Sequence, residues 1–261
     1  MFDKDRLALL EKQFSDRSFF FFDSIDSTNA FAKKAKVIQN NPAVILAYEQ
    51  FAGAGQRAKS WVTEPGKNLT FSLSNKPPSV FNTQHYLLAI SLAITSVLKD
   101  KLGLDTQIKW PNDILVNGKK IAGILVEAIF EGNHFKSLIT GIGLNVNQIQ
   151  FPPELLKPVG SLKLELKSDR DIDLMDLLSW LIHAIDKYTL DSSKEYYVAV
   201  FKEVNELLAY KNEKVKVLIN RQSTIIGTII GIDDNGALWV RDEQENFCKF
   251  LNEQISISAI K

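Results

Sequence analysis

The sequence predicts an α+β protein in which helices pack on a mixed, mostly antiparallel sheet and a small β-barrel follows at the C-terminus. Three patterns indicate this class. Apolar residues recur at the spacing of one helical face over residues 87–102, short strands separated by tight turns fill residues 107–146, and the apolar period changes to that of a strand after Tyr210. We therefore expect two domains, residues 1–210 and 211–261.

The first elements are read from capping residues and apolar runs. Asp26, Ser27 and Thr28 precede an apolar run, and such short polar residues start helices, so a helix is expected from Thr28 to about residue 37. Strands are expected at residues 43–47 and 69–73, with a small, polar and basic loop at residues 53–59 between them. Gly103 is expected to end the helix over residues 87–102.

The later elements follow the same logic. Apolar strands are expected at residues 114–116, 121–128 and 135–140, with turns at residues 117–118 and 131–133. Asp173 is expected to cap a helix that runs to Tyr188, and Ser192 with Glu195 reads as a capping box for a helix that ends near residue 208. Four strands are expected in the small barrel, at residues 214–219, 224–230, 237–240 and 247–251.

Composition excludes several classes of protein. The 261 residues are 45% hydrophobic and 24% charged, which is typical of a folded globular chain. Because 31 basic residues balance 31 acidic ones, attraction of the whole chain to nucleic acid or anionic lipid is not expected, although a local anion site is. One cysteine and three scattered histidines give neither a disulfide nor metal-ligand spacing. With no apolar run near the start that could span a membrane or form a signal peptide, we expect a cytoplasmic protein.

A glycine-rich basic segment at residues 50–61 is the first candidate for chemistry. Gly53 and Gly55 would let the backbone approach a ligand, and Arg57 and Lys59 would supply positive charge for a phosphate. The segment lacks the Lys-Ser/Thr ending of a P-loop, and glycine with charge also describes an ordinary solvated loop.

Two further segments could form the walls of a site. Lys109 ends an apolar strand beside a Pro-Asn-Asp turn, which either holds its ammonium in place or leaves it lying over Trp110. Gly123, Gly141 and Gly143 interrupt two adjacent apolar strands. Interior glycines indicate that a flat ligand or another part of the backbone lies close to them, or that the strands bulge there.

Taken together and in order, these segments resemble the biotin–protein ligase family, which attaches biotin to a lysine of a carboxylase carrier protein. The resemblance runs from about residue 22 to the C-terminus. It implies a class II synthetase-like ligase fold with a C-terminal SH3-like barrel. Its motifs are Asp-Ser-Thr-Asn at 26–29, the loop at 50–61, Lys-Trp-Pro-Asn-Asp at 109–113, Lys-Ile-Ala-Gly-Ile-Leu-Val-Glu at 120–127, Gly-x-Gly-x-Asn at 141–145 and the segment 231–238.

The resemblance implies that biotin reacts with ATP, with Mg²⁺ on the phosphates, to give biotinyl-5'-AMP. Because two anions must meet, we expect Lys109 and Arg57 to be the catalytic cations, and Asp113 to be a base or a supporting residue. The biotin and adenylate site is expected to comprise Ser27, Thr28, Asn29, Gln50, Gly53, Ala54, Gly55, Gln56, Arg57, Trp61, Lys109, Asn112, Gly123, Ile124, Gly141, Gly143 and Asn145.

The chain departs from the family in the loop, where the usual form is Gly-Arg-Gly-Arg-x-Gly-Arg. Ala54 and Gln56 replace arginines, Ala58 replaces a glycine and Lys59 replaces the last arginine, so we expect weaker retention of the adenylate. About twenty residues precede the first motif, which resembles the monofunctional type without a DNA-binding domain, and no DNA binding is expected.

The expected partner is a biotin carboxyl carrier protein, and a homodimer through an exposed sheet edge is left open. Two alternative functions are also left open. One is lipoate–protein ligation, which shares the fold and the adenylation chemistry. The other is a non-catalytic module that binds the vitamin or the carrier.

Overall fold

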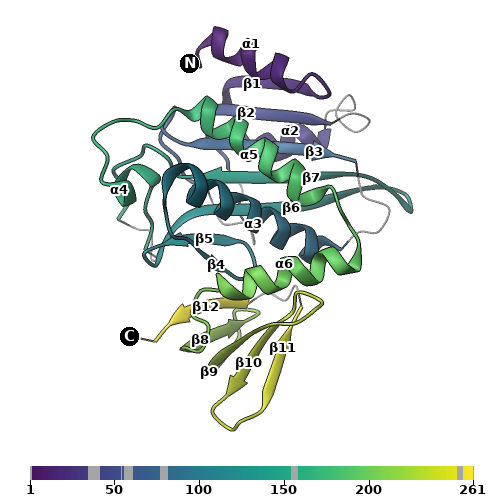
Figure 1. Ribbon diagram of the computed structural model, residues 1–261, viewed down its shortest axis with the longest axis vertical. Coiled ribbons are helices and arrows are strands. Elements are labelled where there is room, and N and C mark those ends of the chain that lie inside the picture. Colours follow the sequence, from purple (N-terminus) through teal and green to yellow (C-terminus); the bar gives the residue numbers. More distant parts are fainter. Residues whose placement is uncertain are drawn as a thin grey trace.

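The computed structural model describes residues 2–34, 42–53, 55, 61–76, 82–153, 158–251 and 255–260, which form two sheets with helices on and between them (Figure 1). The larger sheet has seven strands in the order β1-β2-β3-β7-β6-β5-β4. They are β1 (Ser18–Ile25), β2 (Ala43–Gln50), β3 (Leu69–Asn75), β4 (Gln107–Lys109), β5 (Asp113–Val116), β6 (Lys119–Glu131) and β7 (His134–Leu144).

The larger sheet is mixed and mostly antiparallel, as predicted. Only β1 and β2 pair in parallel among its described pairings, and α2 (Thr28–Lys34) connects them, as a parallel pair requires a crossover. Ser27 starts α2 as predicted, because its Oγ accepts the N–H of Ala30 at 3.3 Å. The rest of the predicted helix, beyond Lys34, lies outside the described residues.

Helices α3 (Thr83–Leu102) and α5 (Leu174–Thr189) cover one face of the larger sheet, and α2 lies on the other (Figure 1). Gly103 ends α3 with a φ of 66°, and the Asp173 carboxylate accepts the first N–H groups of α5, both as predicted. The face under α3 and α5 holds most of the buried apolar side chains of the sheet. The opposite face is therefore the one left available for a ligand site.

The start of α6 (Lys194–Glu206) differs by one residue from the prediction. Its cap is Ser193, whose Oγ accepts the N–H of Tyr196 at 3.3 Å, and not Ser192. The reason is Asp191, whose carboxylate accepts the N–H of Ser193 at 2.7 Å and fixes the chain one residue further on. A short helix, α4 (Leu162–Leu166), was not predicted.

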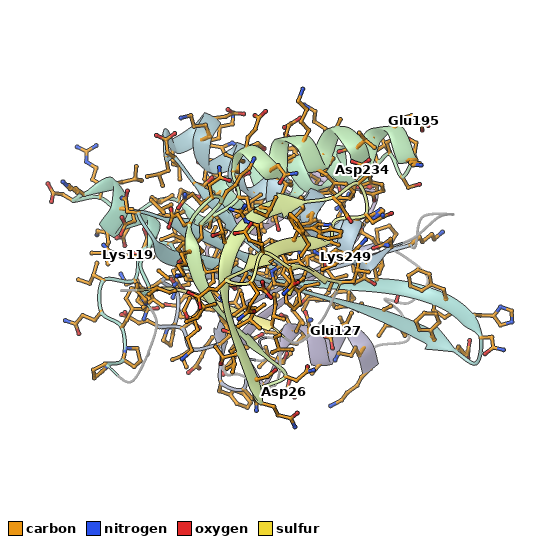
Figure 2. The ribbon with its side chains drawn as sticks, turned by 90° about the horizontal axis from the view of Figure 1, so that it is seen from below. Asp26, Lys119, Glu127, Glu195, Asp234 and Lys249 are labelled. Atoms are coloured by element: carbon orange, nitrogen blue, oxygen red, sulfur yellow. The ribbon has the colours of Figure 1, made fainter. Side chains whose placement is uncertain are left out.

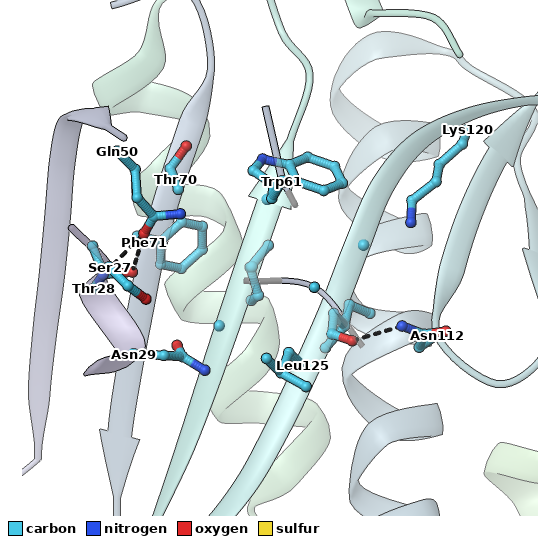
Figure 3. A pocket seen from close by; sticks show the side chains of 16 residues that line it. Ser27, Thr28, Asn29, Gln50, Trp61, Thr70, Phe71, Asn112, Lys120 and Leu125 are labelled. Carbon is cyan, nitrogen blue, oxygen red and sulfur yellow. Dashed lines mark hydrogen bonds between the residues drawn. The ribbon is translucent and has the colours of Figure 1, made fainter. Parts of the chain in front are cut away.

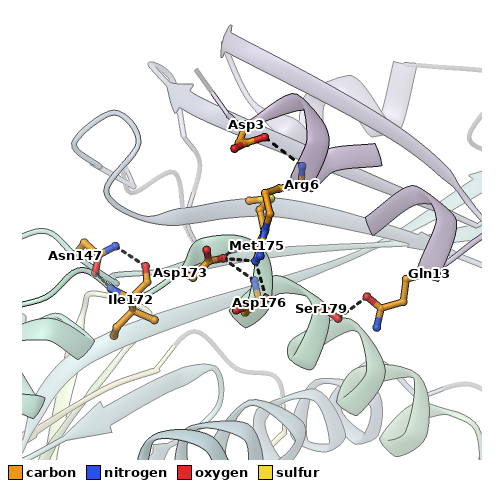
Figure 4. A network of polar contacts seen from close by, with 9 residues as sticks. All are labelled: Asp3, Arg6, Gln13, Asn147, Ile172, Asp173, Met175, Asp176 and Ser179. Atoms are coloured by element: carbon orange, nitrogen blue, oxygen red, sulfur yellow. Dashed lines mark hydrogen bonds and ion pairs between the residues drawn. The ribbon is translucent and has the colours of Figure 1, made fainter. Parts of the chain in front are cut away.

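The N-terminal helix α1 (Lys4–Gln13) is tied to α5 by polar contacts (Figure 4). The Arg6 guanidinium lies 2.9 Å from Asp173 and 2.6 Å from Asp176, and Ser179 donates to Gln13 at 3.0 Å. In the described part of the chain, no helix is both long and apolar enough to cross a membrane.

The C-terminal sheet has five antiparallel strands, one more than the sequence predicted. Their order is β11-β10-β9-β8-β12, and the additional strand is the last one. The strands are β8 (Lys214–Ile219), β9 (Ser223–Ile232), β10 (Leu238–Asp242), β11 (Phe247–Phe250) and β12 (Ile255–Ala259).

Helix α6 and a hydrogen bond connect the two sheets. Helix α6 lies between them (Figure 1), and Trp110 donates its indole N–H to the carbonyl of Gly236 at 3.1 Å. Val215 and Leu238 of the C-terminal sheet belong to the same buried apolar cluster as Phe201 of α6. The division into residues 1–210 and 211–261 therefore stays a prediction.

Candidate active site

A pocket lies where the start of α2, the end of β2 and the middle of β3, β6 and β7 meet (Figure 3). It encloses about 460 Å³ of space, part of it open to solvent. The lining residues are Ser27, Thr28, Asn29, Gln50, Gly55, Trp61, Thr70, Phe71, Asn112, Lys120, Gly123, Ile124, Leu125, Gly141, Ile142 and Gly143.

Gln50 and Thr28 fix each other at one end of the pocket. The Gln50 Oε1 atom accepts the backbone N–H of Thr28 at 2.9 Å and lies 3.2 Å from the Thr28 hydroxyl. Since the amide oxygen is engaged there, the amide nitrogen of Gln50 points into the pocket as a donor (Figure 3). Both side chains are buried, so this polar pair is shielded from bulk water.

Asn29, in the first turn of α2, is held on both sides of its amide. Its Oδ1 accepts the Ser72 hydroxyl at 2.5 Å, and its Nδ2 donates to a Glu127 carboxylate oxygen at 2.8 Å. Gly141 leaves room for this amide, because a Cβ on Gly141 would overlap the Asn29 side chain. The glycine in β7 thus serves a close approach by a side chain of the same protein.

Trp61 explains the other two strand glycines. A Cβ on Gly143 would overlap its indole, and a Cβ on Gly123 would lie 3.2 Å from it. The flat group expected against these strands is therefore this indole, and the β6–β7 register shifts between Ile129 and Phe130 and not at the glycines. The buried indole nitrogen of Trp61 finds no hydrogen-bond acceptor among the residues that the structure describes.

Among the described residues, Lys120, at the start of β6, is the cation that lines the pocket. Its ammonium lies 2.5 Å from a carboxylate oxygen of Asp113 and 5.3 Å from the centroid of the Trp61 ring. The side chains of Lys120 and Asp113 are 27% and 17% exposed. The ammonium is therefore partly shielded from water, which strengthens its effect on a bound anion.

Lys109, expected to be the central cation, is not among the residues that line the pocket. Its ammonium lies 5.8 Å from the ring centroid of Tyr210, and its strand position is paired with Asp113 across β4 and β5. Burial raises the pKa of Tyr210, as do the nearby negative charges of Glu213 and Asp113, so the ring remains neutral beside this lysine. The catalytic role of Lys109 stays a prediction.

Several expected residues meet in the pocket and others do not. Asn112 lines it and is fixed by donating to the carbonyl of Ile124 at 2.9 Å. Asn145 is buried outside the lining, where its amide donates to the carbonyl of Gly160 at 3.0 Å. Gly53 also lies outside the lining, and its carbonyl accepts the N–H of Trp61 at 2.8 Å. Ala54, Gln56, Arg57, Ala58 and Lys59 lie outside the described residues.

Five lining residues were not among those expected: Thr70, Phe71, Lys120, Leu125 and Ile142. For two of them, the sequence contained a feature that could have indicated a place in the site. Lys120 begins a quoted motif, and Leu125 shares a strand face with Gly123 because side chains alternate along a strand. Thr70, Phe71 and Ile142 had no such feature, since apolar and small polar residues on a strand are equally typical of a core.

Comparisons with known proteins agree with this geometry. The profile of the biotin/lipoate A/B protein ligase family matches residues 21–145. The bifunctional ligase/repressor BirA of Bacillus spizizenii is 32% identical over 90% of this chain and 72% of its own length. The biotin–[acetyl-CoA-carboxylase] ligase of Paracoccus denitrificans is 32% identical over 83% of this chain and 91% of its own. The biotin protein ligase of Aquifex aeolicus, solved with biotin and ATP, shares the fold with a TM-score of 0.82, at 23% identity over 93% of this chain and 99% of its own.

Proposed function

This chain belongs to the biotin protein ligase family, and we propose that it is a biotin–[acetyl-CoA-carboxylase] ligase. It activates biotin with ATP to biotinyl-5'-AMP and transfers the biotin to a specific lysine of a biotin carboxyl carrier protein. The observation that carries the proposal is the pocket itself. It has a fixed polar network at one end, apolar walls, and a partly shielded ammonium group near a tryptophan.

The pocket suits biotin because each part of the vitamin has a counterpart. The cyclic urea carries a carbonyl acceptor and two N–H donors, which fit the Gln50 amide and the hydroxyl of Thr28. The apolar ring and chain fit the side chains of Leu125 and Trp61, which line the pocket. The few fixed polar groups supply specificity, and the apolar walls supply contact area.

In the first step an oxygen of the biotin carboxylate attacks the α-phosphorus of ATP. The new phosphorus–oxygen bond forms as the bond to pyrophosphate breaks, so negative charge concentrates where two anions meet. We assign Lys120 to this point, because a fixed cation at developing negative charge is the most effective help a protein can give. Asp113 holds the ammonium in place.

In the second step the neutral amine of the carrier lysine attacks the acyl carbon, and AMP leaves with the electrons of the broken carbon–oxygen bond. The amine must lose a proton, and Asp113 was a candidate to accept it. The Asp113 carboxylate is already engaged by the Lys120 ammonium at 2.5 Å, so the positioning of Lys120 is the better supported role for Asp113.

The expected Mg²⁺ has no resident site in the described residues, where no three His, Cys, Asp or Glu side chains come together to hold a metal. Mg²⁺ commonly binds through substrate phosphates with one or two carboxylates. The ion is therefore expected to arrive with the ATP substrate.

The mass of the carrier tests the proposal. The full chain is incubated with ATP, Mg²⁺, biotin and a biotin carboxyl carrier domain, and the carrier is weighed by mass spectrometry. We expect one biotinyl group on the carrier, and none on a carrier whose acceptor lysine is replaced by arginine. Lipoyl transfer when lipoate replaces biotin, without biotinyl transfer, would identify a lipoate ligase. Biotin binding with an unchanged carrier would identify a non-catalytic module.

A further inference from the structure

Glu127 lies beside the pocket but does not line it. It follows Gly123 and Leu125 on the same face of β6, because alternate residues of a strand share a face. Its two carboxylate oxygens have separate partners on α2: Oε1 lies 2.6 Å from the Lys33 ammonium and Oε2 lies 2.8 Å from the Asn29 amide nitrogen. Asn29 and Lys33 are one helical turn apart and face the same way.

This contact decides which way the Asn29 amide points. A carboxylate only accepts hydrogen bonds, so it selects the NH₂ end of Asn29 and leaves Oδ1 to face Ser72. The single Ser72 proton is then used on Asn29 Oδ1 at 2.5 Å. The 2.7 Å contact between Ser72 and Thr28 then needs the Thr28 proton, so Ser72 accepts there and Thr28 donates. The other acceptor near the Thr28 hydroxyl, Gln50 Oε1, lies farther away at 3.2 Å and already accepts the Thr28 N–H.

The result is a directed chain of hydrogen bonds from Thr28 to Ser72, to Asn29 and to Glu127. Because the Thr28 proton is spent within the chain, the Thr28 hydroxyl can offer only oxygen lone pairs to the pocket. Gln50 offers the opposite polarity, since its amide nitrogen points inward (Figure 3). One acceptor and one donor side by side match the N–H and carbonyl of a cyclic urea.

We propose that Glu127 is a positioning residue for substrate recognition. It sets the direction of the hydrogen bonds that run from Thr28 through Ser72 and Asn29, so that the Thr28 hydroxyl accepts an N–H group of the biotin urea. The inference rests on the proposed function, because it takes biotin as the ligand. Glu127 acts through Asn29 and Ser72 and does not touch the substrate.

Glu127→Gln tests the inference with little change of shape. The Lys33 ammonium would hold the new amide oxygen, so the new NH₂ group would face Asn29 and force its amide to turn round. The direction of the hydrogen bonds from Thr28 to Glu127 would reverse, and the Thr28 hydroxyl would no longer be fixed as an acceptor. We expect the Kd for biotin, measured by calorimetry on the full chain, to rise by about tenfold. The Kd for ATP and the Tm should change little.

Lys33 supplies the control and the rescue. Lys33→Met leaves the Asn29–Glu127 bond intact, so biotin affinity should stay within about twofold of the unmodified protein. Combining Lys33→Met with Glu127→Gln frees the new amide to turn its oxygen toward Asn29. Biotin affinity should then recover most of the loss, which a purely structural role of Glu127 would not produce.

Three results would overturn the inference. Glu127→Gln could bind biotin as well as the unmodified protein, or the double variant could bind it no better than Glu127→Gln alone. If the unmodified chain itself failed to bind biotin, the proposed function would fall together with the inference. If it bound biotin while either of the first two results held, only the inference would fall.

Discussion

A lysine, an aspartate and a tryptophan meet in the same way at two places in this molecule. We name them the pocket triad, which is Lys120, Asp113 and Trp61, and the hairpin triad, which is Lys249, Asp233 and Trp239. In the pocket triad the ammonium lies 2.5 Å from the carboxylate and 5.3 Å from the indole centroid. In the hairpin triad, on the C-terminal sheet (Figure 2), these distances are 2.8 Å and 5.5 Å.

The two triads differ in what remains unsatisfied. Asp233 also accepts the indole N–H of Trp239 at 3.0 Å and the backbone N–H groups of Asn235 and Ala237, so the hairpin triad is closed. The buried indole nitrogen of Trp61 has no acceptor among the described residues. Because unsatisfied buried polar groups are costly, a closed set indicates a role in stability and an open one indicates a place for a ligand. We therefore expect the hairpin triad to stabilise the fold and the pocket triad to bind a ligand.

Replacing the two lysines is the most severe test of this contrast. Lys120→Met should lower biotin-dependent release of pyrophosphate by at least about 100-fold, because it removes the cation that faces the developing charge. Lys249→Met should leave that rate within about twofold. An equal loss of activity in both variants would contradict a catalytic role for the pocket triad and a purely stabilising role for the hairpin triad.

Lys109→Met sharpens the same test. The Lys109 ammonium lies over Tyr210 and outside the pocket lining, so we expect a smaller loss of pyrophosphate release than in Lys120→Met, by about tenfold or more. A loss as large as that of Lys120→Met would bring the end of β4 into the reaction site and restore the role first predicted from the sequence.

Two strand glycines extend the contrast to backbone packing. In Gly143→Ala the new methyl group meets the Trp61 indole, a side chain that can move, so biotin affinity should fall by about tenfold while the Tm changes little. In Gly227→Ala the methyl group would lie 2.5 Å from the carbonyl oxygen of Arg241, which cannot move so easily. The unfolding free energy of the Gly227→Ala variant should fall by about 1–3 kcal/mol, and its biotin affinity should be unchanged. Calorimetric binding and thermal unfolding separate the two outcomes.

The smallest effect concerns pH. Burial tends to raise the pKa of Asp233, but hydrogen bonds from Lys249, Trp239 and the backbone outweigh it and lower the pKa to about 2. The ionised form is thus favoured by folding, and its contribution is present above about pH 4 and lost as the pH falls toward 2. Asp233→Asn should cost at most about 1 kcal/mol of unfolding free energy at pH 7, given the screening by solvent. Denaturant unfolding should show this difference shrinking between pH 4 and pH 2.

Elements with a strong periodic pattern and a cap were predictable from the sequence. Gly103 and Asp173 fix the ends of α3 and α5 through local backbone geometry, which needs no tertiary information. The parallel pairing of β1 with β2 was not predictable in this way, because partners in a parallel pair are chosen by the whole sheet. The start of α6 was misplaced by one residue because Asp191, outside the capping box, binds the N–H of Ser193.

The site was predictable as a set of segments but not as a set of contacts. The motifs indicated Thr28, Gln50 and the strand glycines, and these do meet in one pocket. That Lys120 lines the pocket and Lys109 does not was not readable from the sequence, because it depends on which way each side chain points from its strand. The contact of Glu127 with Asn29 was also not readable from the sequence, because it joins residues 98 positions apart.

A crystal structure with biotin and a non-hydrolysable ATP analogue would test the central claim most directly. We expect the Lys120 ammonium at about 3 Å from an oxygen of the biotin carboxylate, with the urea against Thr28 and Gln50. Biotin bound elsewhere, or a carboxylate held by Lys109 while Lys120 points into solvent, would contradict it.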